Sequence, residues 1–264
     1  MRCDFVTIFP GFYDGILREG LVAKAIAGGL VDVGVHNLRD WALDPHASVD
    51  DAPYGGGAGM VFKAEPFFRA VRSLAQKSQS PPSVVLPSAQ GVPFCQALAE
   101  ELSKKRHLVF LCPRYKGVDE RVVEALVDYE ISLGDYVIQS GDAAAWAVFE
   151  ATVRLVPGVV GDEESVETDS FFKDALLEGP QYTRPREVEG RCVPDVLLSG
   201  DHEAVAAWRK RKAVEKTLKR RPELLEKTRN AGLRELAEEV GKDLKKSRRE
   251  NLSYAPAVKR VHSQ

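Results

Sequence analysis

The amino-acid sequence predicts an α/β fold in which a parallel sheet carries helices on both faces, followed by a smaller, mostly helical C-terminal section. Short apolar runs alternate with amphipathic segments about five times before residue 157, and this order is typical of parallel sheets. Small-residue turns follow several of the apolar runs. At 264 residues the chain is long enough for one large domain with a smaller one beside it.

The charge changes sign along the chain. Residues 201–264 hold 18 Lys and Arg against 10 Asp and Glu, a balance of +8, whereas the whole chain carries −2. The remainder therefore carries −10. A basic section on an acidic body indicates a polyanionic partner, and a solvated charged helix face is an equal alternative.

The composition, 44% apolar and 29% charged, is that of a soluble globular protein. No apolar run approaches the length of a membrane span, and the N-terminus lacks a basic region before an apolar one. The four cysteines are scattered without a CxxC pair, so neither a zinc site nor a disulfide framework is indicated. We expect a cytoplasmic protein whose cysteines are reduced core residues.

The first elements are expected to be a strand, a helix and a second strand. Residues 1–9 are expected to form a strand, and Pro10 and Gly11 end it. Apolar residues recur at helical spacing over 12–25, and residues 30–36 alternate as in a strand.

A long irregular segment, residues 37–60, holds the glycine cluster Pro53–Gly59. A long loop inside a compact domain is usually functional. The cluster lacks the Lys-Ser/Thr ending of a P-loop, so that phosphate site is not predicted. Helices are then expected over 61–76 and 93–105.

Three turns follow predicted strands. The strand at 83–86 leads into Pro87–Gly91, and the buried strand at 107–112 leads into Arg114–Gly117. The turn Leu133–Tyr136 precedes Ser140-Gly141-Asp142, where Asp142 is a fair N-cap. Ligands bind beyond the carboxyl ends of parallel strands, and glycine lets the backbone approach them. Spacing alone nevertheless favours ordinary turns, because such glycines are weak signals.

Helices are expected between about residues 119 and 129, at 143–156, at 202–218 and at 222–244. Asp119 and Glu120 suit the positive end of the first of these helices.

Taken together, several short sequence motifs closely resemble those of the bacterial tRNA (guanine-N1)-methyltransferases, which are trefoil-knotted SPOUT-type enzymes. The motifs are CPRYKGVDERV, SLGDYVIQSGD, IFPGFY, VDDAPYGGGAGM, PSAQG, ETDSF, YTRP, LLSGDH and RRPELL. They cover nearly the whole chain in the family's order. The resemblance implies a parallel-sheet trefoil-knot domain at 1–157, a linker at 158–174 and a helical tRNA-binding domain at 175–264.

The resemblance also implies the activity. The expected reaction is S-adenosylmethionine-dependent methylation of N1 of guanosine-37 in tRNA anticodon loops, by a homodimer that binds neither DNA nor membrane. One alternative is a SPOUT methyltransferase acting on ribose or on another RNA. A second is an RNA-binding protein whose donor site is weakened or lost.

The resemblance assigns catalysis to Asp169, as the base for the N1 proton, and to Arg154, as the cation facing O6. An aspartate with a typical pKa of about 3.9 is a weak base, so a stabilising cation is needed. Ribose methylation has no need to deprotonate guanine N1, so these two residues favour the guanine reaction. From the residues alone, a linker charge and a surface ion pair are the simpler interpretations.

The remaining site residues implied by the resemblance fall into two sets. Those that hold the methyl donor are Leu86, Pro87, Ser88, Gln90, Gly91, Pro113, Tyr115, Lys116, Leu133, Gly134, Asp135, Tyr136, Val137, Ile138, Ser140 and Gly141. Those that bind the substrate are Asp50, Tyr54, Gly55, Gly56, Gly57, Gly59, Ser165, Tyr182, Arg184, Ser199 and Arg209.

Four residues depart from the family's pattern: Pro113 and Ser140 replace glycines, and Lys116 and Asp142 replace glutamates. Proline has no N–H, so a backbone contact to the donor is at risk. Lys116 reverses a charge beside the donor and makes a Mg²⁺ ion there doubtful; no protein metal site is predicted. We expect weakened, not abolished, donor binding.

Overall fold

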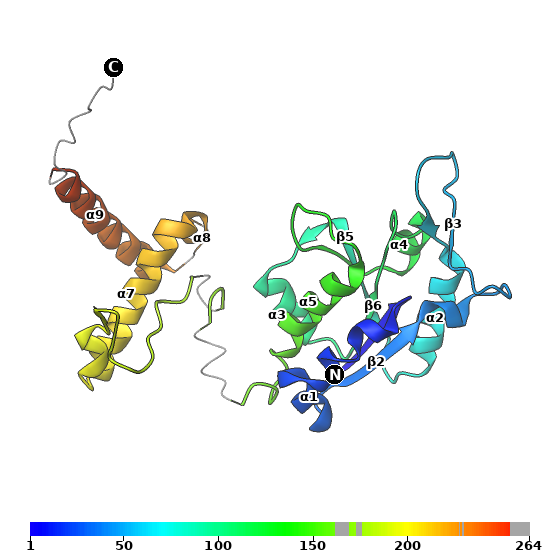
Figure 1. Cartoon of the computed structure of the whole chain (residues 1–264), viewed down its shortest axis with the longest axis horizontal. Helices are drawn as coiled ribbons and strands as arrows, with labels where there is room; N and C mark the ends of the chain where they lie inside the picture. Colours follow the sequence, from blue (N-terminus) through cyan, green and yellow to red (C-terminus); the bar gives the residue numbers. More distant parts are fainter. Residues whose placement is uncertain (162–168, 173–175, 227, 229, 254–264) are drawn as a thin grey trace, which may run out of the picture. The chain divides into compact units, whose positions relative to one another are not determined.

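The computed structural model describes residues 1–161, 169–172, 176–226, 228 and 230–253, with side chains described no further than residue 246. The chain divides into two compact units, Met1–Asp162 and Glu163–Gln264, which are considered separately (Figure 1). The predicted boundaries at 157 and 174 stay predictions.

A five-stranded parallel sheet forms the centre of the first unit. Each pair of neighbouring strands runs parallel, which confirms the predicted class. In spatial order the strands are β2 (Asp32–Asn37), β1 (Arg2–Thr7), β6 (His107–Leu111), β5 (Ser83–Pro93) and β7 (Tyr129–Ser132). The trefoil knot stays a prediction.

Helices cover both faces of the sheet, as expected (Figure 1). Alternate side chains of a strand enter different core clusters: Phe5 and Phe110 pack on one face, Val6 and Val109 on the other. The first cluster includes residues of α1, α3 and α5, and the second includes residues of α2 and α4. The bounds are α1 (Gly20–Ala27), α2 (Ala64–Gln76), α3 (Gln96–Ser103), α4 (Glu120–Leu126) and α5 (Gly141–Val153).

The single helix predicted over 12–25 is wrong. The chain instead forms two 3₁₀ turns, η1 (Pro10–Tyr13) and η2 (Ile16–Arg18), before α1 begins. Gly15 and Gly20 separate the three pieces, and Gly20 has a φ of +65°, which a continuous helix does not allow.

The helix predicted over 61–76 begins later than expected, at Ala64. Val61–Phe62 is a short strand, β4, which pairs antiparallel with β3 (Asp50–Asp51). This pairing holds the two ends of the glycine cluster together. A further 3₁₀ turn, η3 (Leu38–Trp41), lies within the segment expected to be irregular.

The predicted cap of α5 is wrong, because Ser140 occupies the N-cap and Asp142 lies in the first turn. Asp119 does cap α4, and its side chain accepts a hydrogen bond from the Arg121 backbone N–H at 3.0 Å.

The second unit is mostly helical, as expected. Its elements are a hairpin of β8 (Glu187–Val188) and β9 (Arg191–Cys192), η4 (Asp195–Leu198), α7 (His202–Arg220), α8 (Pro222–Glu226) and α9 (Ala231–Ser253). The helix expected over 222–244 is therefore divided. Its small core is formed by Val214, Leu225, Leu233 and Val240, and Arg211 of α7 bonds Glu239 of α9 at 2.7 Å.

The cysteines are predicted to be reduced core residues, and two of the four are buried in the core. Cys3 and Cys112 are buried, whereas Cys95 and Cys192 are exposed, and all four are unpaired. In the part of the chain that is described, no helix is long and apolar enough to cross a membrane.

A buried carboxylate ties three strands together. Asp4 of β1 lies 2.7 Å from His36 Nε2 of β2 and 2.7 Å from His107 Nε2 of β6, and Arg2 Nε donates to it at 2.7 Å. Burial would raise the pKa of Asp4, but the hydrogen bonds from His107, His36 and Arg2 outweigh burial and hold it well below its usual range. The charged carboxylate therefore stabilises the sheet.

We expect Asp4→Asn to lower the free energy of unfolding by about 3 kcal/mol at pH 7, because the buried His107 imidazole and the half-buried His36 and Arg2 side chains lose their charged partner. The depressed pKa means that the wild-type contribution is present above the unfolded pKa of about 3.9 and is lost as the pH falls below it. Urea unfolding between pH 7 and pH 3 measures both effects. Asp32→Asn, at an exposed position of β2, is the control; equal losses in the two variants would contradict the role of Asp4.

Candidate active site

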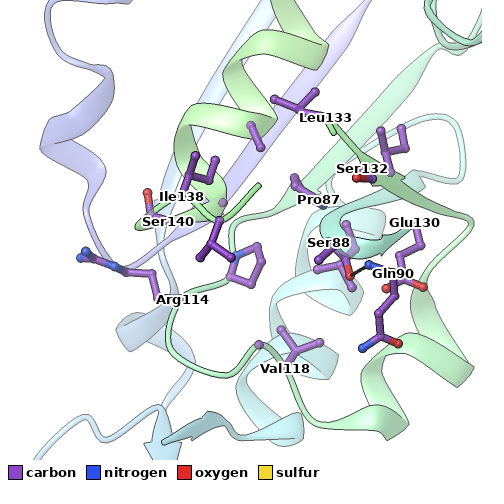
Figure 2. Close-up of a pocket in the computed structure, with 18 of the residues that line it drawn as sticks. Pro87, Ser88, Gln90, Arg114, Val118, Glu130, Ser132, Leu133, Ile138 and Ser140 are labelled. Carbon is purple, nitrogen blue, oxygen red and sulfur yellow. Dashed lines mark hydrogen bonds between the residues drawn. The ribbon is translucent and has the colours of Figure 1, made fainter. Parts of the chain in front are cut away.

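A cavity of about 280 Å³ lies at the carboxyl ends of β6 and β7 and beside residues 86–90 of β5. Three segments line most of it: residues 86–90, 113–118 and 130–141 (Figure 2). The first residues of α4 and α5 complete the wall, through Glu120, Val123 and Ala144. This is the position at which open parallel sheets bind ligands.

A bulge in β5 shapes the first segment. The prediction that the strand ends at residue 86 and leads into a turn at Pro87–Gly91 is wrong, because β5 continues to Pro93 through the bulge. The pairing of β5 with β7 shifts register between Pro87 and Val92, and Ser88 Oγ accepts from the Gln90 N–H at 3.1 Å (Figure 2). Gly91 permits the bulge, because a Cβ there would lie 2.4 Å from the Ile131 backbone N. Gly91 is thus a shaping residue and does not line the cavity.

The second segment is anchored to the strand that follows the glycine cluster. Lys116 N–H donates to Met60 O at 3.0 Å, and Phe62 N–H donates to Gly117 O at 3.0 Å. Tyr115 has a φ of +59°, and its ring centroid lies 5.3 Å from that of Phe62. The glycine cluster therefore ends directly beside the cavity.

The glycine cluster itself adopts backbone conformations that suit glycine. Gly55, Gly56, Gly57 and Gly59 all have positive φ. The methylene stem of Lys116 lies against Gly59, where a Cβ would be 3.2 Å from Lys116 Cγ. Tyr54, within the cluster, is fully exposed.

The third segment meets the second at one close contact. Gly141 N–H donates to Pro113 O at 2.7 Å. A Cβ on Gly141 would lie 2.2 Å from Pro113 Cδ and 2.8 Å from Pro113 N, so no larger residue fits without a shift. This contact joins the loops that follow β6 and β7.

The cavity wall mixes apolar and polar side chains and carries charges of both signs. Arg114 and Glu130 project from different sides of the cavity (Figure 2). The Arg114 guanidinium carbon lies 4.4 Å from the centroid of the Phe9 ring, which fixes its position. Val137 and Ile138 are 96% and 42% exposed, so an apolar surface faces solvent beside the cavity.

Of the predicted donor residues, all except Gly91 and Asp135 line the cavity. The prediction missed Ala89, Arg114, Gly117, Val118, Glu120, Val123, Glu130, Ile131, Ser132, Gln139 and Ala144. Most of these are sequence neighbours of predicted residues. Glu130 and Ile131 were missed because the helix was expected to continue to about residue 129, which obscured β7; the short alternation Tyr129–Ser132 is the signal that could have found it.

The predicted catalytic residues are not in this cavity wall. Arg154 is the C-cap of α5; a helix rises about 1.5 Å per residue, so it lies about 20 Å along α5 from Gly141. Asp169 belongs to the second unit, where its backbone O accepts from Phe172 N–H at 3.4 Å. Each of these side chains has further interactions within the structure.

The predicted substrate residues fall in both units. Asp50 is in β3 of the first unit, next to the glycine cluster. In the second unit the Tyr182 ring centroid is 6.3 Å from that of Trp208, and the Ser199 hydroxyl donates to Val196 O at 2.8 Å. Arg184 and Arg209 are exposed. Ser165 lies outside the described residues.

Across the described residues, no three His, Cys, Asp or Glu side chains are grouped so as to hold a metal ion.

Comparison with known proteins identifies the family. The family model for tRNA (Guanine-1)-methyltransferase TrmD matches residues 1–227. A tRNA (guanine-N(1)-)-methyltransferase of Dictyoglomus turgidum is 50% identical over 246 residues, covering 93% of this chain and 98% of the relative. Relatives of the same name from Geobacter sp. and Frankia casuarinae are 51% and 52% identical to this chain over 227 residues. Each alignment covers 86% of this chain, and the alignments cover 90% of the Geobacter relative and 83% of the Frankia relative. With the matching loops gathered around one cavity, the chain belongs to the tRNA (guanine-1)-methyltransferase TrmD family.

Proposed function

We propose that the protein transfers the methyl group of S-adenosylmethionine to N1 of guanosine-37 in the anticodon loop of tRNA. The observation that carries the proposal is the cavity built from three segments that resemble the family's motifs, with the glycine cluster anchored to its edge. The family's relatives are named for methylation of guanine N1 in tRNA.

The residues of the cavity fit the methyl donor. Apolar side chains such as Leu86, Leu133 and Ile138 suit the adenine ring, and Glu130 suits ribose hydroxyls. Arg114 and Lys116 suit the carboxylate of the methionine portion. When bound, the donor supplies a methyl group on a sulfonium, which is already a good leaving group. The protein therefore contributes mainly position and electrostatics.

Asp169 accepts the N1 proton of the guanine, and Arg154 stabilises the charge that develops on O6. Arg154 lies about 20 Å along α5 from the cavity edge of the same chain. We therefore propose that the protein is a homodimer in which the second subunit completes each site. The predicted substrate residues beside the cavity and in the basic second unit contact tRNA.

Lys116 places an ammonium group beside the donor. A Mg²⁺ ion at the same position would be repelled, so no metal ion takes part in the proposal. The alternative function, RNA binding with a weakened donor site, rests on Pro113, which cannot donate a backbone hydrogen bond.

The purified protein should methylate a tRNA transcript with guanosine at position 37 and leave one with adenosine there unmodified.

Gly141→Ala should weaken donor binding at least about tenfold, because its Cβ meets the Pro113 ring and backbone. Calorimetry with S-adenosylmethionine checks this, and Gly15→Ala, with nothing within 4 Å of its Cβ, is the matched control. Binding of tRNA without donor binding or methylation would support the alternative function.

A shared active site predicts complementation between defective subunits. Gly141→Ala weakens the donor cavity, so activity is measured with donor below the wild-type dissociation constant, and Asp169→Asn removes the base. A purified heterodimer of the two variants should recover about half of the wild-type activity, because one of its two composite sites has every part intact. If each site were built from a single chain, the heterodimer would remain as inactive as its parents.

Pro113→Gly should strengthen donor binding several-fold, because the new residue supplies a backbone N–H that proline lacks. The dissociation constant of S-adenosylhomocysteine, measured by calorimetry, gives the result. An affinity that is unchanged or lower would show that Pro113 does not weaken the site.

A further inference from the structure

Three buried side chains meet behind the donor cavity. Tyr13 of η1 donates a hydrogen bond from its hydroxyl to Asp142 Oδ1 at 3.2 Å, and the same hydroxyl lies 3.3 Å from Cys112 Sγ. Tyr13 and Cys112 are 1% exposed and Asp142 is 2% exposed. Cys112 lies 99 positions after Tyr13 in the chain, and Asp142 lies 129 positions after it. The tertiary fold alone therefore brings the three side chains together.

The position of this cluster links it to the cavity. Cys112 directly precedes the loop 113–118, and Asp142 directly follows Gly141 at the end of the loop 133–141. The loops meet at the cavity wall through Gly141 N–H and Pro113 O. Tyr13 contacts Cys112 and Asp142, the residues next to Pro113 and Gly141, and this contact is buried behind the cavity wall.

The direction of the hydrogen bonds follows from the charges. Burial raises the pKa of the Cys112 thiol, and the nearby Asp142 carboxylate raises it further, so the thiol keeps its proton. Burial likewise raises the pKa of Tyr13. Tyr13 donates its one hydroxyl hydrogen to Asp142, so its oxygen is an acceptor for the Cys112 thiol, for which Phe110 O at 3.9 Å is a second acceptor. The carboxylate lies in the first turn of α5, where the helix dipole also favours a negative charge.

Packing fixes the Tyr13 ring independently of its hydroxyl. The ring centroid lies 4.6 Å from that of Phe5, 5.0 Å from that of Phe12 and 6.4 Å from that of Trp146. Removal of the oxygen alone should therefore leave the ring in place.

We propose that Tyr13 is a positioning residue for the methyl-donor site, whose hydroxyl holds the ends of the loops 113–118 and 133–141 in register. Without it, Asp142 is a buried carboxylate that has lost a donor, which is costly. Movement of the first turn of α5 relieves that cost, and this turn carries Gly141 and Ala144 of the cavity wall. The identity of the donor rests on the proposed function, whereas the coupling of the two loops does not.

Amide hydrogen exchange of the donor-free protein tests the coupling. Tyr13→Phe should accelerate exchange in both loops, and the dissociation constant of S-adenosylmethionine should rise about five- to tenfold. Tyr129→Phe is the matched control, because that variant also removes a hydroxyl that donates to a carboxylate, on Glu101 of α3. It should leave the exchange of both loops unchanged.

A second variant separates positioning from general stability. Asp142→Asn in the Tyr13→Phe background should restore part of the protection, because a neutral amide is less costly to bury than a carboxylate without its donor. A lowered melting temperature with uniform loss of protection, unchanged exchange in the two loops, or no restoration by Asp142→Asn would each overturn the proposal. Faster loop exchange in Tyr13→Phe, in a protein whose wild type binds no donor, would support the coupling and contradict the proposed function.

Discussion

One backbone hydrogen bond, from Gly141 N–H to Pro113 O at 2.7 Å, holds the candidate site together. It joins the loops that follow two different strands, at the edge of the sheet where parallel strands expose their carboxyl ends. The proline ring occupies the space that any side chain at position 141 would need. The cavity thus depends on the absence of a single Cβ.

Stability and ligand binding are assigned to different parts of the same sheet. The Asp4 carboxylate binds side chains of β1, β2 and β6, and so ties these strands to one another through a charged network. The cavity lies at the carboxyl ends of β6 and β7 and beside the bulge of β5, and the loops 113–118 and 133–141 form much of its wall. β6 belongs to both regions, and every one of its residues is buried, so it supplies the rigid support that a precisely shaped loop needs.

Lys116 connects the donor cavity to the glycine cluster. Its backbone N–H bonds Met60 O, and its side-chain stem lies against Gly59. A change in either loop therefore reaches the other through direct contact. For the proposed reaction, this arrangement keeps the donor beside the glycine cluster, whose residues are expected to bind the substrate.

The sequence by itself determined the parallel α/β class, the helices on both faces and the two loops that follow β6 and β7, because strand and helix periodicity and small-residue turns are local signals. Its motifs also identified the family, which the comparisons confirmed. It did not find Glu130 in the four-residue strand β7, the bulge that Gly91 permits, or the division of the helix expected over 12–25. Only the tertiary structure brought Tyr13, Cys112 and Asp142 together and placed Arg154 at the far end of α5 from the cavity. Such contacts depend on the order of strands in the sheet and on long-range packing, which no local pattern of residues records.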